Sequence, residues 1–212
     1  MELEAEIKKA NETVEVIQNE KEKANYSIWL KRLSFRIALI STFTALAIVL
    51  GYLLVHIPNI ELFTLTIFLS GFILGKRDGM IVGLLSSSIF CFFNPFGASP
   101  LPLLTFQLIN YSLVGLMGAL ISYLFKKTNL IKYDDMYNFS VMVILGFIGA
   151  FITLNFQIIS TLIEVLTYGT INQFITRFLT GVIFTVIHIV GNTLGFIFIL
   201  PGLIQLFNKM LY

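Results

Sequence analysis

The residues best suited to bind a ligand lie on one face of the last apolar stretch. Their spacing of four, four, three and four residues is typical of a single helix face. These residues are Arg177, Gly181, Thr185, His188 and Asn192. A guanidinium binds anionic or carbonyl groups well, so Arg177 could hold a ligand, although a salt bridge to Glu164 or Glu61 would also explain it. His188 would lie roughly 16 Å farther along the helix, where an interior hydrogen-bonding role and a ligand or proton role are both open.

A second polar face lies on an earlier apolar stretch. Gln107, Asn110 and Tyr111 follow the i, i+3, i+4 spacing of one helix face. Amides in an apolar environment need hydrogen-bond partners, so this face is expected to point into the protein. Interhelical hydrogen bonds and ligand contacts both fit these residues, and a nearby proline-rich loop favours the ligand.

Proline stiffens two loops. Pro58 lies in the loop 56–59, and three more prolines lie in the loop 94–102. Proline fixes φ and removes a backbone donor, so both loops are expected to end helices in defined shapes. The longer loop, with Asn94, a glycine and a phenylalanine, could close over a pocket. Ordinary membrane-surface turns have the same composition.

The composition is that of an integral membrane protein rather than a soluble domain. Of 212 residues, 57% are hydrophobic and only 12% are charged. The net charge of +2 is too small, and the basic residues too scattered, for a nucleic-acid partner. Cys91 is the single cysteine, which excludes an internal disulfide and a cysteine-based metal cluster. No metal, cofactor or cleavable signal is expected.

Six apolar segments are predicted to cross the bilayer. A span needs roughly 17–25 residues. The predicted spans are 34–55, 59–75, 79–95, 102–125, 139–166 and 174–200. The second and third could form a re-entrant hairpin, but that would place Lys76, Arg77 and Asp78 at membrane depth, at roughly 2.5–3.5 kcal/mol per charge. We therefore predict an all-α integral membrane protein with a six-transmembrane-helix bundle in a membrane domain 31–212.

Basic residues predict the orientation. Lys31, Arg32 and Arg36 precede the first span, and more lysines and arginines follow spans two and four. The loops 56–59, 94–102 and 168–173 carry none. By the positive-inside rule, the N- and C-termini are cytoplasmic in a multi-pass protein of the cell membrane. Arg177 is the exception, a cation near the opposite face.

The segment 1–30 is charged and differs sharply from the rest. One set of positions, apolar except for a lysine, alternates at spacings of four and three, as in a heptad repeat. They are Leu3, Ile7, Ala10, Val14, Ile17, Lys21 and Ala24. We predict a cytoplasmic amphipathic helix that either contacts a partner subunit or forms a solvated extension.

Small residues recur at helix-packing spacing. Gly71, Gly75, Gly79 and Gly83 are each four apart. Internal packing is the expected role of these glycines. On span one, the pairs Ala38 with Thr42 and Ser41 with Ala45 form a flatter small-residue face than one bundle needs, so we expect an external partner helix there.

Enzyme signatures are poor. The chain has no HExxH, no GxSxG and no phosphate-binding loop, so it is not expected to be an enzyme or to hydrolyse ATP itself. An intramembrane hydrolase centred on His188 would need an activated serine. The candidates Ser86 to Ser88 lack the glycine context of an oxyanion hole.

Several motifs between residues 35 and 125 occur in a recognisable order. They are Ala38–Gly51, Ile57-Pro-Asn-Ile-Glu61, Phe68-Leu-Ser-Gly71-Phe-Ile-Leu-Gly75, Gly79 to Gly83, Asn94-Pro-Phe-Gly97, Gln107, and Gly115 to Gly118. Together with six spans and a cytoplasmic N-terminus, this order resembles the substrate-binding S component of an energy-coupling factor (ECF) vitamin transporter. The rest of the chain agrees by its hydrophobic pattern only.

The resemblance implies a six-helix bundle that binds a micronutrient at its outer face, in the plasma membrane of a prokaryote. It also implies a transmembrane T component, contacted through small residues on span one, and two cytoplasmic ATPases that power uptake. The small-residue motif is degenerate in this sequence. The segment 1–30 is longer than the family pattern and could contact the cytoplasmic subunits.

The leading interpretation is a binding subunit for a vitamin-like ligand. The candidate ligand-binding residues are Asn59, Glu61, Asn94, Gln107, Asn110, Tyr111 and Arg177. The candidate partner-binding residues are Ala38, Ser41, Thr42 and Ala45. With little other buried charge, the ligand is expected to be mostly apolar or neutral, with at most one anionic group. The alternative is an assembly subunit that scaffolds partners through small-residue helix faces and the N-terminal helix.

Overall fold

The structure, a computed structural model, describes residues 30, 32–57, 60–128 and 136–211. All its regular elements in these ranges are helical, which confirms the all-α class there. They are α2 (Leu33–Leu54), α3 (Phe63–Leu74), α4 (Lys76–Phe92), α5 (Leu101–Thr128), α6 (Phe139–Tyr168), a 3₁₀ turn (Ile171–Gln173), α7 (Phe174–Thr180), α8 (Val182–Leu194), a π-helical segment (Gly195–Ile199) and α9 (Leu200–Leu211). The helix predicted over 1–30 falls almost entirely outside the described residues.

Four helical stretches in the described part of the chain are long and apolar enough to cross a membrane. They are Leu33–Leu54, Leu101–Thr128, Phe139–Tyr168 and Val182–Leu211. They correspond to the first, fourth, fifth and sixth predicted spans. The other two predicted spans correspond to α3, which has 12 residues, and α4, which has 17 and begins with Lys76, Arg77 and Asp78.

The short helix α3 lies in the core of the protein. Every residue from Phe63 to Phe72 is buried. A helix that is apolar on all sides needs neighbours on all sides. Its neighbours are α2, α4, α5 and α9, so α3 is an internal helix. A polar residue at the first turn of α3 would also be enclosed.

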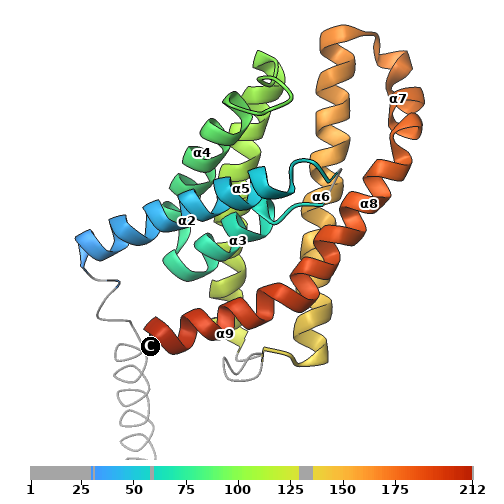
Figure 1. Cartoon of the computed structure of the whole chain (residues 1–212). Coiled ribbons are helices and arrows are strands. Elements are labelled where there is room, and N and C mark those ends of the chain that lie inside the picture. Colours follow the sequence, from blue (N-terminus) through green and yellow to red (C-terminus); the bar gives the residue numbers. More distant parts are fainter. Residues whose placement is uncertain (1–29, 31, 58–59, 129–135, 212) are drawn as a thin grey trace, which may run out of the picture.

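The helices form two groups (Figure 1). Helices α2, α3, α4 and α5 pack on one another, and α2 runs across the others. Helices α6, α8 and α9, with the π-helical segment, form the second group, and α7 continues it beside the end of α6. Contacts of α5 with α6 and of α3 with α9 join the groups. The segment that enters α3 therefore lies where the two groups meet.

Glycines allow α3, α4 and α5 to approach closely. A Cβ atom at Gly71 or Gly79 would overlap the backbone carbonyl of Gly115, and one at Gly83 would overlap the carbonyl of Tyr111. Gly75 has a φ of 93° and forms the turn between α3 and α4, a conformation that suits glycine. The prediction of internal packing is confirmed for Gly71, Gly79 and Gly83, whereas Gly75 serves the turn.

Two side-chain contacts join α2 to α4, one near each end of these helices. Arg36, in the first turn of α2, pairs with Asp78 in the first turn of α4. At the opposite ends of the same helices, the Tyr52 hydroxyl donates to the carbonyl oxygens of Ile89 and Phe93 at 3.3 and 3.2 Å. Each contact joins ends that the predicted topology places on one side of the membrane.

The sixth predicted span differs from the structure in both bounds. The prediction ran from 174 to 200, whereas the apolar helix runs from Val182 to Leu211, after a break between α7 and α8 at Gly181. Pro201 lies inside this helix although proline lacks an N–H. In the structure the π-helical turn Gly195–Ile199 precedes Pro201, and its wider bonding pattern lets the helix continue as α9.

Candidate functional site

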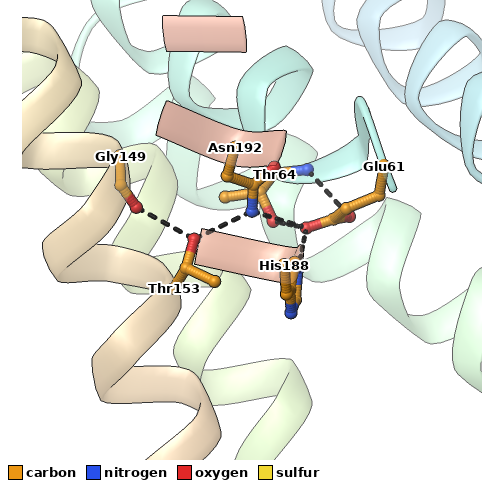
Figure 2. A network of polar contacts seen from close by, with 6 residues as sticks. All are labelled: Glu61, Thr64, Gly149, Thr153, His188 and Asn192. Carbon is orange, nitrogen blue, oxygen red and sulfur yellow. Dashed lines mark hydrogen bonds and ion pairs between the residues drawn. The ribbon is translucent and has the colours of Figure 1, made fainter. Parts of the chain in front are cut away.

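A buried polar cluster lies at the junction of the two helix groups, around Glu61. We call Glu61, Thr64, Thr153, His188 and Asn192 the Glu61 centre (Figure 2). Glu61 and Thr64 come from the entry to α3, Thr153 comes from the middle of α6, and the other two come from α8. Three separate parts of the chain therefore place polar side chains at one point.

Hydrogen bonds hold the Glu61 carboxylate from two sides. The Thr64 hydroxyl donates to Oε1, and the Thr64 backbone N–H donates to Oε2 at 3.3 Å. From α8, Asn192 Nδ2 donates to Oε1 at 3.3 Å, and His188 Nε2 lies 3.3 Å from the same oxygen. Oε1 is therefore crowded with partners, whereas Oε2 has capacity for another donor.

The network continues into α6. Asn192 Nδ2 also donates to Thr153 Oγ1 at 2.8 Å, and the Thr153 hydroxyl donates to the carbonyl of Gly149 at 2.9 Å. Thr153 and Asn192 are 2% and 3% exposed. Because both are enclosed and bonded, they hold α8 at a fixed register against α6 and orient the Asn192 amide toward Glu61.

Aromatic rings surround the Glu61 centre. Phe156 packs edge-on to His188, with ring centroids 6.4 Å apart, and Tyr111 lies 5.9 Å from Phe156. Tyr111 in turn meets Phe63 edge-to-face at 4.9 Å, and Phe106 stacks on Phe156 at 5.7 Å. The chain thus lines one side of the centre with flat apolar faces from α3, α5 and α6.

Among the candidate ligand-binding residues and the Glu61 centre, three buried polar atoms have no hydrogen-bond partner in the described part of the chain. They are Gln107 Oε1, Asn110 Nδ2 and His188 Nδ1. Buried polar atoms are nearly always bonded, so unpaired ones need an explanation. Gln107 and Asn110 share the face of α5 that carries Tyr111, as their spacing predicts. A bound molecule would supply the missing partners.

The two proline-stiffened loops are described only in part. Asn59 lies outside the described residues. Asn94 accepts a hydrogen bond from the Phe96 backbone N–H at 2.9 Å, and Gly97 has a φ of 106°. His56 and Phe96 bring the two loops together, with ring centroids 6.0 Å apart. In this structure Asn94 shapes its own turn, and a ligand contact by Asn94 stays a prediction.

Arg177 forms an ion pair with Glu164. Arg177 Nη1 lies 2.8 Å from Glu164 Oε1, and the two side chains are 35% and 54% exposed. Both line a hollow of about 480 Å³ between the end of α6 and the start of α7 and α8, which Thr161, Gly181 and Thr185 also line. Of the two salt-bridge partners considered for Arg177, the structure selects Glu164. A ligand contact by Arg177 stays a prediction that competes with this pair.

The small-residue face of α2 lies on the surface of the protein. Ala38, Ser41, Thr42 and Ala45 are all exposed, whereas Phe43, Thr44, Ala47 and Gly51 face the interior. The Thr42 hydroxyl is satisfied by the carbonyl of Ala38, at 2.9 Å. Among the four candidate spans α2 is the least buried, with 17% of its apolar window enclosed. The predicted partner face is therefore not covered by the described part of this chain.

Sequence reasoning found most residues of the Glu61 centre but not their association. It placed His188 and Asn192 on one helix face and singled out Glu61 apart from them. It omitted Thr64 and Thr153 of the centre and the neighbouring Phe156. A threonine or phenylalanine in an apolar helix gives no signal by itself. The spacing of Gly149 and Thr153, one turn apart, was the available hint of a close helix crossing.

The structure thus defines an all-helical protein with four candidate membrane helices and an enclosed polar centre with aromatic walls. In comparisons with known proteins, no family model, curated protein or solved structure matches this chain.

Proposed function

We propose that this chain is the membrane-embedded substrate-binding (S) subunit of an ECF-type importer, in the plasma membrane of a prokaryote. It captures a vitamin or a related small cofactor precursor at the outer face. A transmembrane T component and two cytoplasmic ATPases then drive uptake. The proposal includes six spans, with α3 and α4 as the second and third, and cytoplasmic termini.

The Glu61 centre is the observation that carries the proposal. A carboxylate, an imidazole and an amide meet inside an otherwise apolar bundle, beside rings from Tyr111 and Phe156. Polar groups inside a membrane protein are expensive, and they usually mark a substrate or ion path. Small-molecule sites combine apolar walls with a few converging polar groups. The unpaired polar atoms of Gln107, Asn110 and His188 support a ligand over a purely structural network.

The exposed face of α2 supports the proposed T component. Ala38, Ser41, Thr42 and Ala45 form a shallow surface against which another helix could pack closely. Leu46 and Val49 continue this exposed surface of α2 with apolar side chains. An importer subunit without a nucleotide-binding motif needs such a contact, because partner subunits supply the energy.

Retention of a small molecule tests the proposal. The full-length chain, purified in mild detergent, is expected to carry a bound small molecule in native mass spectrometry. The double variant Glu61→Ala, His188→Ala is expected to lose it. Val186→Ala, at a site on α8 that is 52% exposed, serves as the matched control and should retain it. A wild-type protein that carries no small molecule would contradict the proposal and favour an assembly subunit.

A further inference from the structure

Glu61 is a buried carboxylate whose partners, apart from a histidine, are uncharged. Within the described part of the chain, its contacts are with Thr64, His188 and Asn192, and none is with a lysine or arginine. The Glu61 side chain is 20% exposed and that of His188 is 11% exposed. An ionised carboxylate in such a place needs a compensating charge.

His188 is poorly placed to provide that charge. Its Nε2 faces Glu61, but its Nδ1 is buried and has no acceptor among the described residues. A protonated imidazole ring carries a proton on each nitrogen, so one N–H would be left without a hydrogen bond. The neutral ring, with its proton on Nε2, leaves Nδ1 as a free acceptor. In that state of the ring, no cationic side chain of the described residues contacts Glu61.

The surroundings of Glu61 offer acceptors and aromatic faces. His188 Nδ1 is a buried, unpaired acceptor, and Glu61 Oε2 receives a single long bond from Thr64. Tyr111 and Phe156 present rings, whose faces attract cations. Acceptors and ring faces together suit a ligand that brings N–H donors and a positive charge.

Arg177, the anchor considered for an anionic ligand group, is already engaged. Its guanidinium pairs with Glu164 at 2.8 Å, and this pair is separate from the contacts of Glu61. An anion placed against Glu61 would meet its carboxylate and the unpaired acceptor Nδ1 of His188. The electrostatics of the Glu61 centre therefore disfavour an anion and favour a cation.

We infer that the Glu61 centre binds a small molecule with a protonated nitrogen on or beside a planar ring. The nitrogen pairs with Glu61, and the ring lies against Tyr111 and Phe156. This inference rests on the proposed binding function and specifies its ligand class. It replaces the expectation of a mostly apolar or neutral ligand with a cationic one.

Three small aromatic probes of similar size distinguish a cationic ligand from a neutral or an anionic one. Benzylamine is a cation at neutral pH, benzyl alcohol is neutral and benzoate is an anion. Isothermal titration of each into the full-length chain in lipid nanodiscs gives their affinities. Benzylamine is expected to bind at least about tenfold more tightly than benzyl alcohol, since a hydrogen bond to a charged group contributes about 1.5–3 kcal/mol. Benzoate is expected to show no saturable binding. This comparison needs no variant.

Substitution then tests whether the Glu61 carboxylate causes the preference for benzylamine. Glu61→Gln keeps the size and hydrogen-bonding capacity of the side chain but removes its charge, and is expected to abolish the preference for benzylamine. Glu164→Gln removes the same charge from the exposed ion pair and is expected to keep the preference. Thermal unfolding of both variants in the same nanodiscs checks that they are folded.

The outcomes also separate this inference from the proposed function. If benzyl alcohol or benzoate binds as tightly as benzylamine, or if Glu61→Gln keeps the preference, the cationic class is wrong. A co-purified molecule without a basic nitrogen leads to the same conclusion, and the binding function stands in these cases. If no probe binds and the purified chain carries no small molecule, both proposals fail.

Discussion

Arg36 and Asp78 form a two-point ion pair between the first turns of α2 and α4. Arg36 Nε donates to Oδ2, and Nη2 donates to Oδ1, both at 2.8 Å. The aspartate side chain is 4% exposed and the arginine side chain is 37% exposed. A two-point guanidinium contact constrains orientation as well as distance, so this pair helps to set how α2 crosses α4.

Removing Arg36 is expected to lower the unfolding free energy more than removing the charge of Asp78. Arg36→Ala leaves a buried carboxylate without a counter-ion, which should cost about 3 kcal/mol of unfolding free energy. Asp78→Asn leaves a guanidinium that can turn toward water, and should cost about 1 kcal/mol. Reversible denaturation in detergent micelles measures both. Equal losses, or the opposite order, would contradict the asymmetry of burial.

Close packing of α3 on α5 predicts a severe effect of one methyl group. A Cβ atom at Gly71 would overlap the Gly115 carbonyl, so Gly71→Ala should destabilise the protein by about 3 kcal/mol. Gly181 is the control, since the nearest atom to its Cβ position would be 3.6 Å away. Gly181→Ala should leave stability unchanged or raise it by up to about 1 kcal/mol. The same unfolding assay compares them, and similar losses would refute the packing argument.

Segment length predicted the long helices well and the last one poorly. The predicted spans 102–125 and 139–166 match α5 and α6 to within a few residues. The final predicted span ended at 200, whereas the helix continues through Pro201 to Leu211. Hydropathy reports how much apolar chain is present, but not whether a π-helical turn will accommodate a proline.

Helical spacing predicted the faces of the candidate site but not their partners. It placed His188 with Asn192, and Gln107 with Tyr111, because residues three or four apart share a face. The contact between Glu61 and His188 joins residues 127 positions apart. Such a contact depends on how the two helix groups dock, and no local pattern encodes it. By contrast, Glu164 is 13 positions from Arg177, across one short connection, so local reasoning could find that pair.

Larger side chains on the exposed face of α2 are expected to leave the isolated chain stable but to weaken its complex with partner subunits. Ala38→Leu and Ala45→Leu should leave thermal stability nearly unchanged, because both positions are exposed. Each should reduce co-purification with the co-expressed T component and its ATPases, because a larger side chain prevents close helix approach. Ile183→Leu, at a position on α8 that is 69% exposed, is the matched control. Unchanged co-purification of both α2 variants would exclude this face as the contact.

Cysteine labelling distinguishes six spans from a re-entrant arrangement of α3 and α4. The native Cys91 is 3% exposed and is first replaced by serine. Arg77→Cys and Ala98→Cys then introduce single thiols at exposed positions, before and after the body of α4. With six spans, a membrane-impermeant maleimide applied to intact cells should label the Ala98→Cys variant alone, and permeabilised cells should add labelling of Arg77→Cys. A re-entrant hairpin would hold position 77 at membrane depth, where three neighbouring charges cost roughly 2.5–3.5 kcal/mol each. In that arrangement Arg77→Cys would react poorly from either side, so its labelling after permeabilisation decides whether α3 and α4 both cross the bilayer.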